Sequence, residues 1–205
     1  IGCVSVGGMI NNVKTFASIL MPGVQHMRHT HLPEHKFVSG QPETGGDLAD
    51  DLERIASNFG PENIAACIVE PIAGSTGTLV PPKGYLQRLR EICDKHGILL
   101  IFDEVITGWG RTGSAFASHE FGVTPDIMTM AKATTNGVVP MGVVACKDEI
   151  YDAVMDASPM GSVELFHGYT YSGVPVAVAA GLAVQDIFEK EDIFNRAKNL
   201  APYFQ

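Results

Sequence analysis

The chain has 205 residues and a net charge of −9, and apolar residues make up 45% of it. This composition can bury a sizeable core without disulfides or metals, whereas the acidic balance argues against a nucleic-acid partner or an anionic membrane surface. No run of 18 apolar residues predicts a membrane span, and the first ten residues lack the basic segment of a secretory signal.

The cysteines indicate a redox compartment, and the first residue indicates how the chain relates to a longer protein. Four cysteines, at positions 3, 67, 93 and 146, form no CxxC pair. A globular chain of this length needs no disulfides, so we expect four reduced thiols in a cytoplasmic protein. The chain starts at Ile1 without an initiator methionine, so we expect it to begin inside a larger protein.

Helical patterns recur along the chain. Residues 20–46, rich in His, Pro and Gly, indicate a long irregular connection. Apolar residues spaced by three and four predict helices over residues 47–59 and 83–96, which Gly60 and Gly97 end. Further helices are predicted over residues 175–189, with Pro175 in the first turn, and over about 192–205.

Short apolar runs predict strands between these helices, over residues 64–69, 98–102, 126–131 and 141–146. The alternation indicates an α/β fold, a three-layer sandwich around a mostly parallel sheet that is covered on both faces. Each of the first three predicted strands is followed directly by a charged residue: Glu70, Asp103 and Lys132. Ligands of such sheets bind beyond the carboxyl ends of the strands, so we expect one polar site there. The alternative is that each residue marks where its strand reaches the surface.

Lys132 and Asp103 have side chains that suit one kind of chemistry. A lysine is a nucleophile only in its neutral form, which partial burial favours, and we expect such burial for Lys132 after its apolar run. The small residues Ala133 to Gly137 leave room for a flat cofactor. A carboxylate such as Asp103 can keep a pyridine nitrogen protonated and make the ring an electron sink. Pyridoxal phosphate (PLP) chemistry needs both roles, although patterning alone leaves it one option among several.

Several motifs, in order, resemble those of the class III PLP-dependent aminotransferases. They are IFDEVITGWGRTG at 101–113, TPDI at 124–127 leading to Lys132, IVEP at 68–71 and YTYSG at 169–173. The resemblance covers nearly the whole chain, and the stretches 74–77, 81–86 and 167–173 resemble the omega-amino acid:pyruvate (β-alanine:pyruvate) branch. It implies that residues 1–205 form most of the large PLP-binding domain of a fold type I, aspartate-aminotransferase-like enzyme. The last helix, about 192–205, would lead towards a small domain outside the chain.

The resemblance also implies roles for particular residues. Lys132 would bind PLP as a Schiff base, and Asp103 would pair with the pyridine nitrogen. Val105 would pack on one face of the ring. Thr170, with the backbone at Tyr169, would bind the cofactor phosphate of the neighbouring subunit.

Other positions are less typical of the family. Glu70 would orient groups near the ring, and Ser75 stands where some other members carry Glu. Ala133-Thr134 replaces the Gly-Leu commonly seen after the lysine, and Val174 stands where this branch usually has His. The family's phosphate loop, ring-stacking aromatic residue and substrate arginine are expected outside this chain.

The implied reaction is transamination from an omega-amino acid or amine, such as β-alanine, to a keto acid, with pyruvate expected. The implied assembly is a homodimer with shared active sites, or a tetramer. Two alternatives stay open: another PLP reaction on the same fold, as in an aminomutase or decarboxylase, or a non-catalytic fragment that lacks the full site. The residues do not identify the amino donor.

Three further features have more than one interpretation. The histidines at 26, 29, 31 and 35 could hold a metal, but a loop-like segment without Cys favours solvated or hydrogen-bonded histidines, and no metal site is predicted. Trp109, between two glycines, could equally line the site or fill the core. Asp103-Glu104 could be an acid/base pair or a Mg²⁺ ligand, which the lack of a preceding phosphate-binding loop disfavours.

Overall fold

The computed structural model describes residues 1–159 and 168–204. The chain divides into two compact units, Ile1–Leu100 and Ile101–Gln205. The strands of the described residues form a sheet in the order β1-β2-β3-β4. Each overlaps a strand predicted from the sequence, with the bounds Ala66–Val69 for β1, Leu99–Asp103 for β2, Ile127–Met130 for β3 and Val143–Cys146 for β4.

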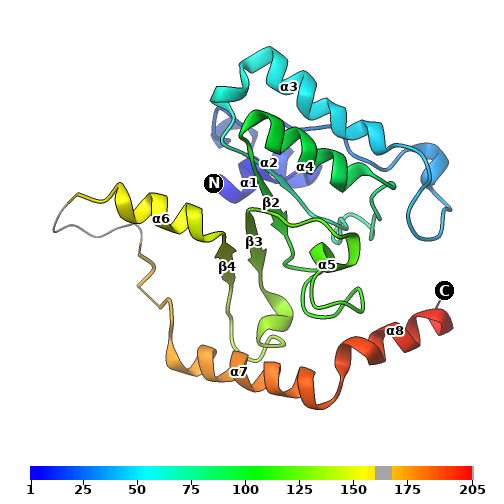
Figure 1. The fold of residues 1–205 in the computed structure, drawn as a ribbon, viewed down its shortest axis with the longest axis vertical. Coiled ribbons are helices and arrows are strands. Elements are labelled where there is room, and N and C mark those ends of the chain that lie inside the picture. Colours follow the sequence, from blue (N-terminus) through cyan, green and yellow to red (C-terminus); the bar gives the residue numbers. More distant parts are fainter. Residues whose placement is uncertain (160–167, 205) are drawn as a thin grey trace. The chain divides into compact units, whose positions relative to one another are not determined.

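The first unit is built on two helices that lie side by side, α3 (Asp51–Phe59) and α4 (Tyr85–His96) (Figure 1). Both were predicted, but each begins later than the apolar period suggests. Residues Gly46–Asp50 form a 3-10 turn before α3, and a Cβ on Gly46 would lie only 2.5 Å from the Lys83 carbonyl oxygen. Helix α4 starts after Gly84, whose φ of +77° is left-handed. Close backbone approach and a left-handed residue therefore set these boundaries.

The core of the first unit lies along the facing apolar sides of these helices. Buried side chains recur at helical spacing in both, and none is more than 5% exposed: Leu48, Leu52, Ile55 and Ala56 on one side, and Leu86, Leu89, Ile92 and Cys93 on the other. Burial of a Leu or Ile side chain contributes about 1.5–3 kcal/mol. Apolar packing therefore supplies most of the stabilisation between α3 and α4.

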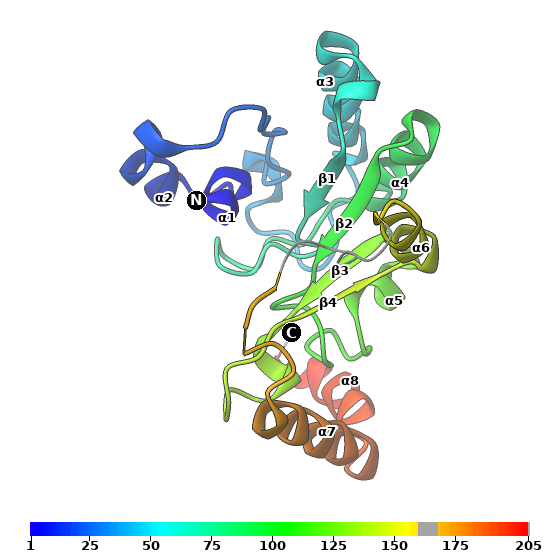
Figure 2. The same cartoon turned by 90° about the vertical axis from the view of Figure 1, so that its left-hand side faces the viewer.

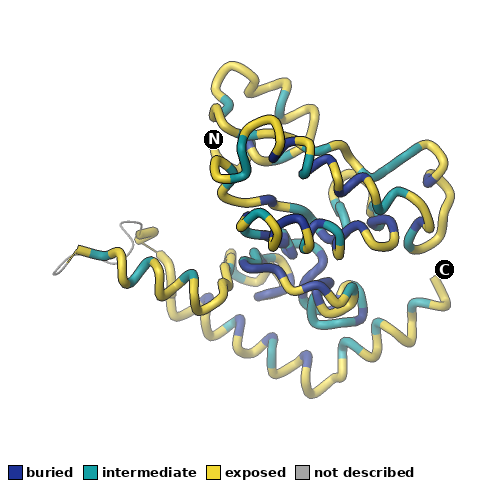
Figure 3. Tube along the Cα trace, turned by 45° about the horizontal axis from the view of Figure 1, so that its top comes forward, coloured by how far each residue is buried: buried dark blue, intermediate teal, exposed yellow. Residues whose placement is uncertain are grey.

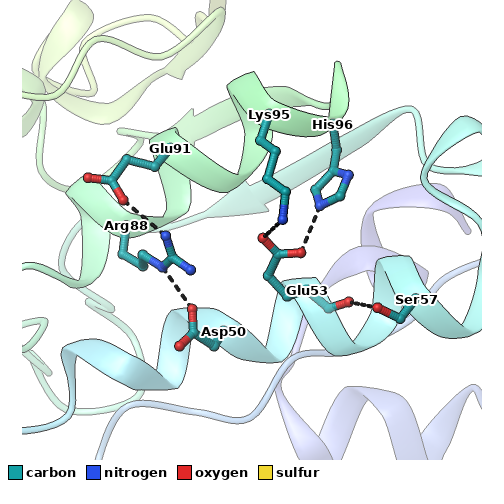
Figure 4. Close-up of polar contacts among 7 residues, drawn as sticks. All are labelled: Asp50, Glu53, Ser57, Arg88, Glu91, Lys95 and His96. Atoms are coloured by element: carbon teal, nitrogen blue, oxygen red, sulfur yellow. Dashed lines mark hydrogen bonds and ion pairs between the residues drawn. The ribbon is translucent and has the colours of Figure 1, made fainter.

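Ion pairs join the outer sides of the same two helices (Figure 4). The Glu53 carboxylate accepts hydrogen bonds from Lys95 Nζ at 2.8 Å and from His96 Nε2 at 2.7 Å. The hydrogen bond from Lys95, followed by that from His96, lowers the pKa of Glu53 below its ordinary value. Arg88 Nε donates to Asp50 Oδ1 at 2.7 Å. Exposed pairs of this kind contribute about 0–1 kcal/mol each, so they orient the helices more than they stabilise them.

The second unit contains the carboxyl-terminal half of β2 together with β3 and β4, which follow one another in Figure 2. Strand β2 pairs with β3 in parallel, with Asp103 opposite Thr129. Strand β3 pairs with β4 in antiparallel fashion. The helices of this unit are α5 (Ala117–Phe121), α6 (Asp148–Asp156), α7 (Pro175–Lys190) and α8 (Ile193–Phe204). Helices alternating with a mixed sheet confirm the predicted α/β class.

Burial in the second unit differs from the expectation of a sheet covered on both faces. Strand β2 alternates between fully buried and half-buried residues, whereas Val144, Ala145 and Cys146 of β4 are exposed. Figure 3 shows how buried, intermediate and exposed residues alternate along the helices. Strand β4 has one neighbour in the sheet order, which leaves it at an edge. Helix α7 buries one face only, through Ala177, Gly181, Val184 and Phe188. Most of β4 is therefore exposed at the edge of the predicted α/β sheet.

Several short elements were not predicted. They are α5 and α6 together with α1 (Gly2–Val6), α2 (Ile10–Thr15) and the 3-10 helices Ala17–Ile19, Pro33–His35, Pro61–Asn63 and Lys132–Thr134. Most span six residues or fewer, too few for a helical period to be recognised. Helix α6 is longer, and its apolar residues Ile150, Ala153 and Val154 do recur at spacings of three and four, so this helix was missed although the sequence carries its period. Among the described residues, no helix has the length and apolarity needed to cross a membrane.

Candidate active site

The second unit brings Asp103 and Lys132 to the same end of two neighbouring strands. Asp103 is the last residue of β2, and Lys132 follows Met130, the last residue of β3, by two positions. The two strands are parallel, so their carboxyl ends meet at one edge of the sheet. Adjacent strands lie about 4.8 Å apart. The parallel pairing of β2 with β3 therefore explains why these two residues lie at the same edge, as expected from the sequence.

The carboxylate of Asp103 is held by one of its two oxygens. Oδ1 accepts hydrogen bonds from the Val105 backbone N–H at 3.0 Å and from Thr129 Oγ1 at 3.3 Å. Among residues 1–159 and 168–204, Oδ2 accepts none. The group is therefore oriented at one oxygen and able to accept an N–H donor at the other. Val105 is half-buried and begins the turn beside this carboxylate. Thr129 was not predicted, and only the register of β2 on β3 reveals its role.

The backbone at Lys132 is strained. Its φ is +48°, in the left-handed region, which costs about 1–2 kcal/mol for a residue other than Gly. Such outliers cluster at functional sites and persist where their surroundings hold them. Ala133, Thr134 and Thr135, which follow, are all buried.

The side chain of Lys132 itself is exposed, as are Asn136, Gly137 and Val138 after it. The expectation of partial burial is therefore wrong for the described chain, because the turn that carries Lys132 projects from the end of β3.

Trp109 connects this turn to the core of the second unit. Its indole Nε1 donates to Thr134 Oγ1 at 3.0 Å. Its ring contacts Phe116 edge-on, with centroids 5.0 Å apart, and lies 6.2 Å from the ring of Phe188 on α7. Trp109 therefore fills the core, one of its two predicted roles, and also contacts the segment that carries Lys132. Thr134 was not identified from the sequence, although it departs from the commoner Leu.

The carboxylate of Glu104, next to Asp103, is fixed by hydrogen bonds within the protein. Glu104 is fully buried, and its carboxylate accepts from Thr107 Oγ1 at 2.7 Å and from the backbone N–H groups of Ala117 and Ser118 at 2.8 Å. Those two N–H groups open α5, where a negative charge is favourable. The three bonds occupy the carboxylate, so Glu104 fixes the loop after β2 and is not a ligand or an acid/base group.

Replacing Glu104 with Gln should destabilise the protein by about 3 kcal/mol, because the amide NH₂ would face N–H donors and the buried charge-assisted bonds would be lost. The midpoint of urea unfolding measures this. The matched control is Glu120→Gln, since Glu120 is exposed and its carboxylate accepts a hydrogen bond from Ser114 Oγ at 2.8 Å, and this variant should change stability little. Equal midpoints for the two variants would contradict the structural role.

Glu70 lies in the first unit, after β1. It is half-buried, and its Oε2 accepts the backbone N–H of Gly74 at 2.9 Å. This bond closes the beginning of the predicted 74–82 loop, in which Ala73 and Leu79 form a bridge and Ser75 is exposed. The role of Glu70 near a cofactor ring stays a prediction.

Tyr169 and Thr170 lie in an exposed turn directly before α7. Gly173, in the same turn, has a φ of +72°. No side-chain hydrogen bond caps the N-terminus of α7 within the described part of the chain. Pro175 has no N–H there, and the Ala177 and Val178 N–H groups donate to the Val174 carbonyl oxygen. His167, which begins this motif, falls outside the described residues. The assignment of Thr170 to a phosphate stays a prediction.

The histidine-rich segment makes local contacts. His35 is buried and its Nδ1 bonds with the Thr30 carbonyl oxygen at 3.0 Å, while His26 Nε2 bonds with the Gly7 carbonyl oxygen at 3.1 Å. Within residues 1–159 and 168–204, no group of three or more His, Cys, Asp or Glu side chains is arranged to hold a metal ion. All four cysteines are free thiols, with Cys67 and Cys93 buried.

Comparison with known proteins places the whole chain in one group. A family model described as aminotransferase class-III matches residues 1–205. The chain is 58% identical over 205 residues to an omega-aminotransferase of Caulobacter vibrioides, covering 100% of this chain and 46% of the relative. It is 52% identical over 203 residues to a beta-alanine–pyruvate aminotransferase of Pseudomonas aeruginosa, covering 98% and 45%. The chain thus spans a little under half the length of these curated relatives.

A solved structure gives the same result at the level of the fold. The omega transaminase from Pseudomonas jessenii, in complex with PMP, matches with a TM-score of 0.80 and 36% identity. The match covers 94% of this chain and 42% of that one.

Proposed function

The chain belongs to the class-III aminotransferase family, and we propose that it carries the cofactor-holding residues of a PLP-dependent transaminase. Its fold is that of solved transaminases, as the predicted fold type I implies. The observation that carries the proposal is the placement of Asp103 and Lys132 at the same end of neighbouring parallel strands, with one Asp103 oxygen that accepts no hydrogen bond from the described residues.

The donor set of the second unit fits PLP. Asp103 Oδ2 can accept a hydrogen bond from a protonated pyridine nitrogen, while Val105 N–H and Thr129 Oγ1 hold Oδ1 and fix the direction of the free oxygen. Val105, beside that carboxylate, would pack on one face of the ring. Lys132 follows the end of the adjacent strand, and its side chain is exposed. Glu70 would contribute a further carboxylate near the ring.

Bound PLP supplies an aldehyde that captures the amino group of the donor and a pyridine ring that accepts electrons from the donor carbon. The protein's residues do the rest. The Lys132 amine would hold the cofactor covalently in the resting enzyme, and the same amine, when free, would take the proton from the donor carbon as a general base. Asp103 would keep the ring nitrogen protonated through a charge-assisted hydrogen bond. Lys132 would then deliver that proton to the cofactor carbon as a general acid.

The amino donor and acceptor are proposed from the relatives. Those named omega-aminotransferase and beta-alanine–pyruvate aminotransferase support an omega-amino acid or amine such as β-alanine as the donor, and pyruvate as the acceptor. Incubating the intact protein with PLP, β-alanine and pyruvate should produce alanine. Formation of CO₂ or of an isomeric amino acid instead of alanine would favour a decarboxylase or aminomutase, and no reaction would favour a non-catalytic chain.

The proposed setting is a cytoplasmic homodimer or tetramer in which residues 1–205 form most of a large cofactor domain and α8 leads towards a small domain. Free thiols support the location. The turn at Tyr169 and Thr170 is exposed and therefore accessible to a neighbouring subunit, which supports shared sites. In this arrangement, Thr170 and the backbone at Tyr169 bind the phosphate of the neighbour's cofactor.

Mixed subunits test whether the sites are shared. Lys132→Ala and Thr170→Ala subunits of the intact protein should each be nearly inactive alone. In a mixed dimer, one site receives Lys132 from one chain and Thr170 from the other, so activity should return towards about half of wild type per heterodimer. If Thr170 serves its own chain, every site lacks one group. Verified heterodimers that recover no activity would refute the shared site.

A further inference from the structure

The left-handed turn at Lys132 must be held by the residues around it. The φ of +48° at Lys132 is unfavourable for a residue with a Cβ. The 3-10 turn Lys132–Thr134 is closed by the Thr134 backbone N–H, which donates to the Ala131 carbonyl oxygen at 3.1 Å. One backbone hydrogen bond of ordinary length thus spans the turn that carries Lys132.

A second hydrogen bond, from the Thr134 side chain, reaches the same carbonyl oxygen. Thr134 Oγ1 lies 3.1 Å from the same Ala131 carbonyl oxygen and 3.0 Å from the indole Nε1 of Trp109. The indole N–H is a donor only, so the hydroxyl must accept from Trp109, and its one proton is then directed to Ala131. Trp109 therefore fixes the orientation of the Thr134 hydroxyl, and that hydroxyl holds the carbonyl on the N-terminal side of Lys132.

Trp109 is itself held firmly. Its backbone N–H donates to the Ala115 carbonyl oxygen at 2.6 Å, and its ring packs against Phe116. It also packs against the cluster of Ala133, Val184 and Phe188. Ala133, the residue after Lys132, belongs to this same cluster, so both neighbours of Lys132 are anchored while its side chain stays exposed.

We propose that Trp109 and Thr134 are positioning residues, which together hold the Lys132 turn so that its amine is aimed at the cofactor beside Asp103. This inference rests on the proposed function, because the direction of the Lys132 amine matters only if the cofactor binds beside Asp103. In this sequence the indole donor of Trp109 and the hydroxyl acceptor of Thr134 occur together. With the Leu commonly found at the position of Thr134, the half-buried indole N–H would face an apolar group and lose its acceptor.

The test compares variants of the intact protein that delete one side of the hydrogen bond. Thr134→Val removes the hydroxyl and nearly keeps the shape, whereas Trp109→Phe removes the indole N–H together with part of the ring but keeps an aromatic side chain. PLP is added to each PLP-free protein, and the rate at which the Schiff-base absorbance appears is recorded, together with its pH titration. Each variant should bond PLP about tenfold more slowly, as expected for a lost buried hydrogen bond. The double variant should be no slower than Thr134→Val, because both act on one hydroxyl.

Two matched variants separate positioning from a general loss of stability. Thr107→Val also deletes a buried threonine hydroxyl in this unit, one that donates to Glu104 Oε2 at 2.7 Å, and should keep the wild-type rate. Thr134→Ser keeps the hydroxyl and should also keep the wild-type rate. Wild-type rates in Trp109→Phe and Thr134→Val, equal slowing in Thr107→Val, or additive slowing in the double variant would each overturn the inference. A wild-type Schiff base on another lysine would instead overturn the proposed function, and this inference with it.

Discussion

Replacing Lys132 with Ala should abolish transamination, lowering the rate of alanine formation from pyruvate by at least about ten-thousandfold. The substitution removes the amine that bonds the cofactor and the base that moves the proton of the donor carbon. PLP should then bind only non-covalently and be lost on gel filtration. Steady-state assays of the purified variant, with PLP in excess, measure the effect.

Lys147→Ala is the matched control for this experiment. Lys147 also follows a strand of the second unit, but its Nζ pairs with Asp126 Oδ1 at 2.7 Å. Its replacement should leave kcat close to that of wild type. A Lys132→Ala variant that keeps more than about a hundredth of the wild-type rate would show that another group performs the proton transfer.

Asp103→Asn should lower kcat by at least about a hundredfold, or roughly 2.7 kcal/mol in barrier. The substitution keeps the shape of the side chain and its acceptor for Val105 N–H, but removes the charge that holds the pyridine nitrogen protonated. A charge-assisted hydrogen bond in a half-buried site contributes more than a surface pair. The kcat for transamination, measured at saturating PLP, is the relevant quantity.

Asp126→Asn gives the comparison for Asp103. Asp126 is also a buried carboxylate of this sheet, but it precedes β3 and therefore lies at the opposite end of that strand from Lys132. Its loss should lower stability through the broken pair with Lys147 and leave kcat nearly unchanged. Near-normal turnover in Asp103→Asn would mean that Asp103 is only a strand-end carboxylate.

The sequence predicted the elements whose apolar residues repeat over a sufficient length. Helices α4 and α7 and the strands β2 and β3 fall where the periods indicate, because each buries a defined face against its neighbours. Helix α6 also carries apolar residues at helical spacing, Ile150, Ala153 and Val154, but it was not predicted and none of its residues is buried. The starts of α3 and α4 were predicted less well than those of α7 and α8, because close contacts such as that of Gly46 with Lys83 depend on tertiary packing.

The same limit applies to the candidate site. Asp103 and Lys132 were identified because a charged residue at the end of an apolar run is visible in sequence. Their partners were not, since Thr129 meets Asp103 across 26 positions and Trp109 meets Thr134 across 25. Such pairings follow from strand register and from packing of the aromatic cluster. The left-handed φ of Lys132 likewise has no signature in the residue type, since glycine is the usual occupant of that conformation.

Mapping the covalent link between the cofactor and the protein tests most directly whether Lys132 is the cofactor lysine. The intact protein loaded with PLP is reduced with borohydride, digested and analysed by mass spectrometry. The reduced cofactor should be found on Lys132, in the peptide that continues through Ala133-Thr134-Thr135-Asn136. Attachment to Lys14, Lys36, Lys83 or Lys147 instead, or no attachment to any lysine of this chain, would contradict the assignment.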